Sequence, residues 1–174
     1  MPKIASDDGY VVLRDATRVR VVTVRGLRTY ITNFMNEQFR KYDLPPIPIV
    51  LWEEPPIHLT SSYAWISLAR EEGKAVAISF SLPHMGGMNM EQLRETMLHE
   101  LCHYLIFQQQ PELKEENDGH GPVFYETCRM VGCEPARGGT HDIIHSRFRR
   151  SLTRDISDAN EEILFGDLGK VKPT

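Results

Sequence analysis

Two histidines with a glutamate between them are the residues of this sequence best suited to chemistry. His99, Glu100 and His103 form the pattern H-E-x-x-H within "ETMLHELCHYLIF", residues 95–107. Positions four apart on a helix lie one turn apart on the same face, so both imidazoles can be offered to one metal ion. Glu100 would be rotated by about 100° from His99 and could reach a water at that metal.

This spacing predicts a catalytic zinc site. Zinc held by three protein ligands keeps a fourth position open for water and makes that water a better nucleophile. Glu100 would take a proton from the water during attack on a peptide carbonyl and pass it to the leaving amine. The pattern is short and also occurs by chance, in which case the histidines merely share a helix face. Its place in the strongest helical segment of the chain favours one Zn²⁺ per chain.

The third metal ligand has several candidates. His120 lies in "DGHGPVF", where a glycine on each side allows the backbone to approach a metal closely. Glu126 follows shortly afterwards. His141 and His145 again have the spacing of neighbours on a helix, although a solvated helix face is the simpler interpretation of that pair.

Length and composition limit the kind of protein that could carry this site. The 174 residues favour one domain, and 41% hydrophobic with 25% charged residues is typical of a globular chain. A net charge of −4 argues against a protein that mainly wraps nucleic acid. No apolar run approaches the ~20 residues of a membrane span. Without a secretory signal or a disulfide framework, we expect a cytoplasmic protein with no membrane partner.

Hydrophobic periodicity predicts the elements that would position the site. We expect an N-terminal hairpin, a helix from Leu27 to about Tyr42, a short buried strand and a second hairpin. The ranges of these strands are 10–14, 18–25, 47–52, and the runs on either side of residues 71–73. The strand at 75–82 could line a cleft and, as an edge strand, would accept an extended peptide.

The second half of the chain is predicted to be mainly helical. Asn89 and Gln92 form a capping box for a helix over 90–109, which holds the H-E-x-x-H pattern. Pro122 suits the first turn of the next helix, and Gly132 suits its end. A last amphipathic helix is expected to begin after Thr140.

The combination of "HELCHY" and "DGHGPVF" resembles the SprT-like zinc metallopeptidases, the Spartan-related family. Its members carry HExxH on a helix, then a loop, then a histidine followed by glycine and, shortly after, an aromatic residue. These positions correspond here to His99, Glu100, His103 and His120, with Phe124 as the aromatic residue. The resemblance implies that His120 is the third zinc ligand and that Glu100 is the general base of a metallopeptidase.

The resemblance also implies a fold and its boundaries. The expected class is α+β, a small zincin-like protease core with a short mixed or antiparallel sheet packed on an N-terminal helix and on the HExxH helix. We expect a strand or hairpin extension at 1–26, the metallopeptidase domain at 27–152 and a C-terminal tail at 153–174. The tail is expected to be less ordered after about Asp158.

The family link to DNA-bound protein substrates, including DNA–protein crosslinks, is weaker for this sequence. Many members carry a zinc ribbon after the core, but Cys128 and Cys133 cannot build one and no cysteine pair follows them. A basic cluster with Arg147, Arg149 and Arg150 could contact phosphates, or it could be a solvated helix face. The expected partner is a protein or peptide substrate, with DNA as a further candidate.

Three more side chains are candidates for contacts with the substrate or the transition state: His84, Tyr104 and Tyr125. A histidine just before the active helix, or a phenol near the zinc, could stabilise an oxyanion, although local packing explains all three as well. The rival function is a catalytically silent zincin-fold module that binds or regulates. An intact Glu100 favours the enzyme, because a purely structural site has no use for a base.

Overall fold

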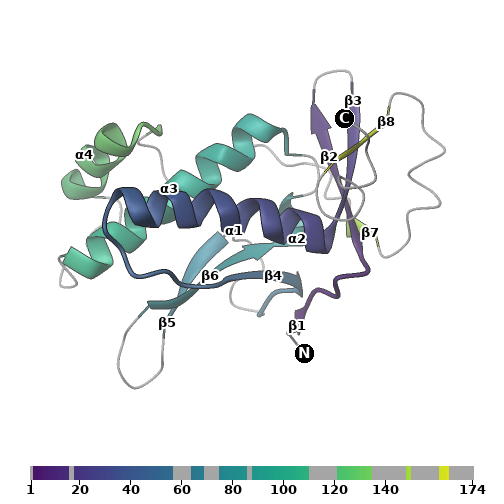
Figure 1. The fold of residues 1–174 in the computed structure, drawn as a ribbon, viewed down its shortest axis with the longest axis horizontal. Helices are drawn as coiled ribbons and strands as arrows, with labels where there is room; N and C mark the ends of the chain where they lie inside the picture. The colour runs from purple at the N-terminus through teal and green to yellow at the C-terminus, as the bar shows by residue number, and fades with distance from the viewer. Residues whose placement is uncertain are drawn as a thin grey trace.

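The computed structural model describes residues 2–15, 18–56, 64–68, 75–85, 88–109, 121–134, 148–149 and 161–164 (Figure 1). The elements in chain order are β1 Lys3–Ile4, β2 Tyr10–Asp15, β3 Arg18–Thr23, α1 Val24–Lys41, β4 Ile49–Glu54, β5 Ala64–Leu68, β6 Ala75–Ser81, α2 Leu82–Met85, α3 Met90–Gln109, α4 Pro122–Val131, β7 Phe148–Arg149 and β8 Glu161–Leu164. Helices and small sheets together make the predicted α+β fold. None of the helices in these ranges is long and apolar enough to span a bilayer.

The first of the two sheets is mixed and has the strand order β1-β4-β6-β5. β4 and β6 run parallel, whereas β1 pairs with β4 and β5 pairs with β6 in antiparallel fashion. The condition that would let the 75–82 strand accept a peptide is not met, because β6 lies between β4 and β5 and is not an edge strand. All of its residues except Val76 are buried, which is typical of a central strand covered on both faces.

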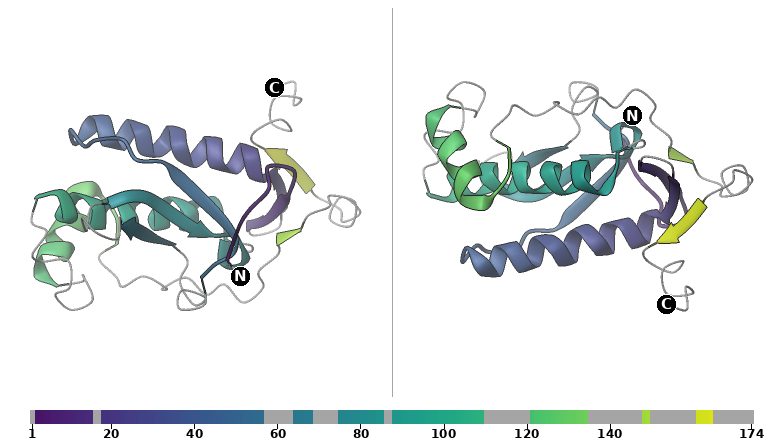
Figure 2. Two further views of the ribbon diagram at one scale, coloured as in Figure 1. Left: turned by 90° about the horizontal axis from the view of Figure 1, so that it is seen from below. Right: turned by 90° about the horizontal axis from the view of Figure 1, so that it is seen from above.

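Helices α1 and α3 enclose the core against this sheet (Figure 2). The buried side of α1 repeats at helical spacing, with Val24, Leu27, Ile31, Met35 and Phe39. The helix begins three residues before the predicted Leu27. Its N-cap is Thr23, whose side-chain oxygen accepts a hydrogen bond from the Gly26 backbone N–H at 2.8 Å.

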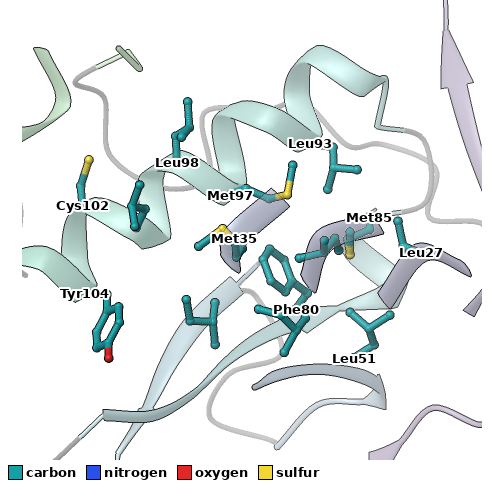
Figure 3. Close-up of a cluster of buried hydrophobic side chains, with 14 of the residues drawn as sticks. Leu27, Met35, Leu51, Phe80, Met85, Leu93, Met97, Leu98, Cys102 and Tyr104 are labelled. Atoms are coloured by element: carbon teal, nitrogen blue, oxygen red, sulfur yellow. The ribbon is translucent and has the colours of Figure 1, made fainter. Parts of the chain in front are cut away.

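The predicted capping box fixes the start of α3. The side chain of Asn89 accepts from the Gln92 N–H at 2.8 Å, and the side chain of Gln92 accepts from the Asn89 N–H at 3.0 Å. Figure 3 shows Leu93 and Met97 of α3 among the side chains of α1 and the sheet. Helix α3 is therefore capped at its start and anchored in the core along its length.

A second sheet has the order β7-β2-β3-β8. The predicted hairpin is confirmed as β2 and β3, which pair in register from Tyr10↔Thr23 to Asp15↔Arg18. The helix predicted after Thr140 is wrong at Phe148–Arg149, because these two residues form β7 against Tyr10 and Val11. The tail also contains order that was not expected, since β8 pairs in parallel with β3. Both partners come from distant parts of the sequence, so local periodicity could not show them.

Candidate metal centre

The two histidines of α3 point their ring nitrogens at each other. The Nε2 atoms of His99 and His103 are 3.1 Å apart, and both rings are half-buried. Two nitrogens that each lie ~2.0–2.1 Å from a tetrahedral zinc ion are about 3.3 Å apart, so this spacing fits a shared metal. Each of the two histidines and Glu100 offers one ligand atom, and these three atoms lie within 4.8 Å of one another.

Glu100 is buried although it is acidic, with 5% of its surface exposed. Desolvation raises the pKa of its carboxyl group to about 8, because burial penalises the charged form. A divalent cation held by the neighbouring histidines would favour the ionised carboxylate again. The ionisation of Glu100 would therefore respond to a cation bound at the two histidines.

Phe124 of α4 packs against both histidines, a role that the sequence reasoning did not assign. Its ring centroid lies 4.9 Å from that of His99 and 4.7 Å from that of His103. Phe124 is 1% exposed, so the face of the imidazoles that it covers is buried. The aromatic position in "HGPVF" was the signal that could have indicated this contact.

The first turn of α4 positions Phe124. Pro122 occupies the first turn, as predicted, and Gly121 is the N-cap. Within the helix, the Thr127 hydroxyl donates to the Val123 carbonyl one turn earlier, at 2.7 Å. Chain order therefore brings the segment that follows His120 directly to the two histidines of α3.

The candidates for a third ligand differ in what the structure shows. Glu126 is exposed on α4 and does not join the group formed by His99, Glu100 and His103. His120, His141 and His145 lie outside the described residues, so their part in the site remains a prediction.

The three candidate contacts with substrate or transition state, Tyr104, His84 and Tyr125, have different environments. The buried Tyr104 donates its hydroxyl to the Pro45 carbonyl at 2.6 Å and packs edge-on against Phe39, an arrangement that favours core packing. His84 is half-buried, its Nδ1 forms a 2.7 Å hydrogen bond with the Ser81 hydroxyl, and burial lowers its pKa. Tyr125 is 37% exposed on α4 and can meet a ligand from solvent.

The basic cluster is described only in part. Arg149 lies in β7, whereas Arg147 and Arg150 are outside the described residues. The idea of a continuous basic helix face is therefore not supported at Arg149, because this residue is in a strand.

A comparison with models of protein families gives a match. The model of the SprT-like family matches residues 29–147, which is more than half of the 174-residue chain. A search of curated proteins finds no match. The matched region contains most of α1, the central strands, α3 with its two histidines, and α4. The chain therefore belongs to the SprT-like family.

Proposed function

We propose that the protein is a zinc-dependent endopeptidase whose metal ligands are His99, His103 and His120. The observation that carries the proposal is the convergence of two Nε2 atoms, 3.1 Å apart, beside the buried carboxyl group of Glu100. Membership of the SprT-like family supports a peptidase role. The choice of His120 as the remaining ligand rests on the resemblance of "DGHGPVF" to the histidine motif of that family.

Each residue has a distinct task in this proposal. A zinc ion at the two imidazoles would act as a Lewis acid that polarises the scissile carbonyl and activates a water. Glu100 accepts the proton of the attacking water and later donates it to the leaving amine. Phe124 keeps the imidazole rings in place and excludes water from one side of them. His99 and His103 remain half-buried, so the site is open to a substrate on its other side.

The arrangement of the sheet supports an extended peptide as substrate. Within the described residues, β5 has a strand partner on one side only, β6, and it packs near α3. An outer strand presents backbone N–H and C=O groups to which an extended peptide can add. Backbone recognition of this kind tolerates many side chains, so we propose low sequence specificity. Proteins bound to DNA are a candidate subset of substrates, and the cytoplasm is the proposed compartment.

Replacement of the general base tests the mechanism. Glu100→Gln is expected to abolish cleavage of an unfolded protein such as casein while one zinc per chain is retained. The matched control is Glu91→Gln, which changes an exposed carboxylate on the same helix and should leave cleavage intact. Cleavage by a zinc-loaded Glu100→Gln variant at the wild-type rate would exclude the mechanism. Bound zinc with no cleavage by the wild type would favour a silent zincin-fold module.

Zinc content tests the ligand assignment. We expect His120→Ala to lose the metal and the double variant His141→Ala/His145→Ala to keep it. The reverse result would move the third ligand to that pair. Addition of DNA to the wild-type cleavage assay tests the DNA link, and an unchanged rate at low salt would argue against it.

A further inference from the structure

A second group of metal-binding side chains lies beside α3 and takes no part in the proposed peptidase chemistry. It consists of Cys102, Cys128 and Cys133, whose Sγ atoms all lie within 4.8 Å of one another. Cys102 and Cys128 are fully buried, and Cys133 is 8% exposed. These are also the three cysteines of the whole sequence. Three thiols from separate positions therefore meet at one buried point.

The local structure explains how the thiols come together. Cys102 lies on α3, and Figure 3 shows its sulfur on the opposite side of that helix from the Tyr104 ring. Cys128 lies on α4, which packs on α3. Gly132 ends α4 with a φ of 95°, a left-handed conformation that suits glycine. The chain then folds back, and the Gly132 and Cys133 N–H groups both donate to the Cys128 carbonyl at 2.8 and 3.0 Å.

The distances between the sulfur atoms suit a metal ion. The Sγ atoms of Cys102 and Cys133 are 3.6 Å apart. Two thiolates bound to one tetrahedral zinc ion at ~2.3 Å are about 3.8 Å apart, so little movement is needed. Thiols that only fill space need not converge in this way, since buried cysteine otherwise behaves as a small hydrophobic side chain.

We propose that Cys102, Cys128 and Cys133 form a second metal site, which binds a soft, thiophilic ion. Thiolate ligands select monovalent copper or zinc over hard cations such as Mg²⁺. Zinc would require a fourth ligand. Glu95 acts electrostatically on Cys128, and its Oε1 accepts the Glu134 N–H at 2.8 Å, but it is not part of the converging group. Three sulfur ligands alone suit Cu⁺. The bound ion fastens the C-terminal end of α4 to the middle of α3.

The test is a metal titration of the reduced, zinc-loaded protein without oxygen. Addition of Cu⁺ is expected to give one copper per chain by native mass spectrometry and an ultraviolet thiolate-to-copper charge-transfer band. Because the sequence has no other cysteine, that band reports this cluster alone. A parallel titration of the metal-free protein with Co²⁺, as a stand-in for zinc, shows through its own thiolate band whether the cluster also binds a zinc-like ion. Absence of a thiolate band in both titrations would overturn the proposal.

Variants assign the ligands. Cys128→Ala is expected to lose the copper band, and Met130→Ala is the matched control. Met130 is a sulfur-containing residue on the same helix, but it is 59% exposed. A full copper band in Cys128→Ala would overturn the three-thiol site. Should that variant not fold, X-ray absorption at the copper edge of the wild type must count three sulfur neighbours, and two or fewer would overturn it.

The histidine site can be separated from this result. His103→Ala is expected to lose zinc and to keep the copper band in full. Loss of both metals in that variant would show one shared site and would overturn the proposal of a second one. Failure of the peptidase assay alone leaves the copper result unaffected, because no readout here depends on cleavage.

Discussion

Helix α3 contributes to two candidate metal-binding clusters that differ in access to solvent. The histidines are half-buried and lie beside a carboxyl group, whereas the cysteines are buried where α4 packs on α3. Catalytic zinc sites keep an open position for water and substrate, and structural sites are fully enclosed by protein ligands. If both proposed sites bind metal, the solvent-accessible histidine site would suit catalysis and the buried cysteine site would suit a structural role.

The largest expected effect follows from removing a histidine. His103→Ala removes one of the two converging nitrogens, so we expect loss of stoichiometric zinc and of all measurable protein cleavage. Zinc analysis after dialysis and a fluorogenic casein assay measure both quantities. Zinc bound with unchanged affinity in this variant would contradict the assignment of the open site.

Phe124 lies between the histidine cluster and the cysteine cluster. It contacts both histidines and lies one helical turn before Cys128. Truncation of a buried Phe to Ala costs about 3–5 kcal/mol in unfolding free energy, so the milder change Phe124→Leu is the better test. We expect Phe124→Leu to fold and to bind zinc more weakly by about 10–100-fold, as supporting residues of metal sites do. Denaturant unfolding and zinc competition with a chelator measure the two effects. Wild-type zinc affinity in Phe124→Leu would show that the ring does not position the imidazoles.

Tyr104 provides a test on the core side of the same helix. Tyr104→Phe removes the hydrogen bond to the Pro45 carbonyl, so we expect a loss of about 1 kcal/mol in unfolding free energy. The kcat/KM for casein should stay within twofold of the wild type. A large fall in kcat/KM with unchanged stability would instead return Tyr104 to the list of catalytic residues.

The smallest expected effect lies far from both clusters. The hydrogen bond from Arg28, with further help from Arg25, holds the pKa of Asp7 below its ordinary value of 3.8. A depressed folded-state pKa adds stability above the unfolded pKa, and this stability is lost as the pH falls through the folded pKa. Asp7→Asn should therefore reduce stability slightly at pH 6 and make less difference at pH 3. Because Asp7 is 40% exposed, both effects are small. An equal loss at both pH values, measured by urea unfolding, would show that the charge is irrelevant.

The sequence was sufficient for elements whose signals are local. The stripe of α1, the capping box of α3, and the Pro122 and Gly132 ends of α4 all depend on residues within a few positions of one another. The histidine pair belongs to the same class, because its geometry follows from helical spacing alone.

Features that depend on distant residues could not be predicted in the same way. The spacing of His141, His145 and Phe148 fits a helix locally, yet Phe148 pairs with Val11 as a strand. Likewise, Cys102 and Cys133 appear unrelated in the sequence but meet because α4 packs on α3 and Gly132 reverses the chain. A third ligand, if one exists, also depends on long-range contacts, so helical spacing alone could not choose between His120, Glu126 and the pair His141 and His145.

The two short strands β7 and β8 have a consequence for how the protein can be shortened. They cover the two sides of the β2–β3 hairpin, which contains the buried Val11, Val21 and Val22. A chain cut after α4 would keep the proposed peptidase residues but leave two unprotected ladders of valine-rich backbone. Such ladders are templates for self-association, so a fragment designed around the metal centre alone is expected to aggregate.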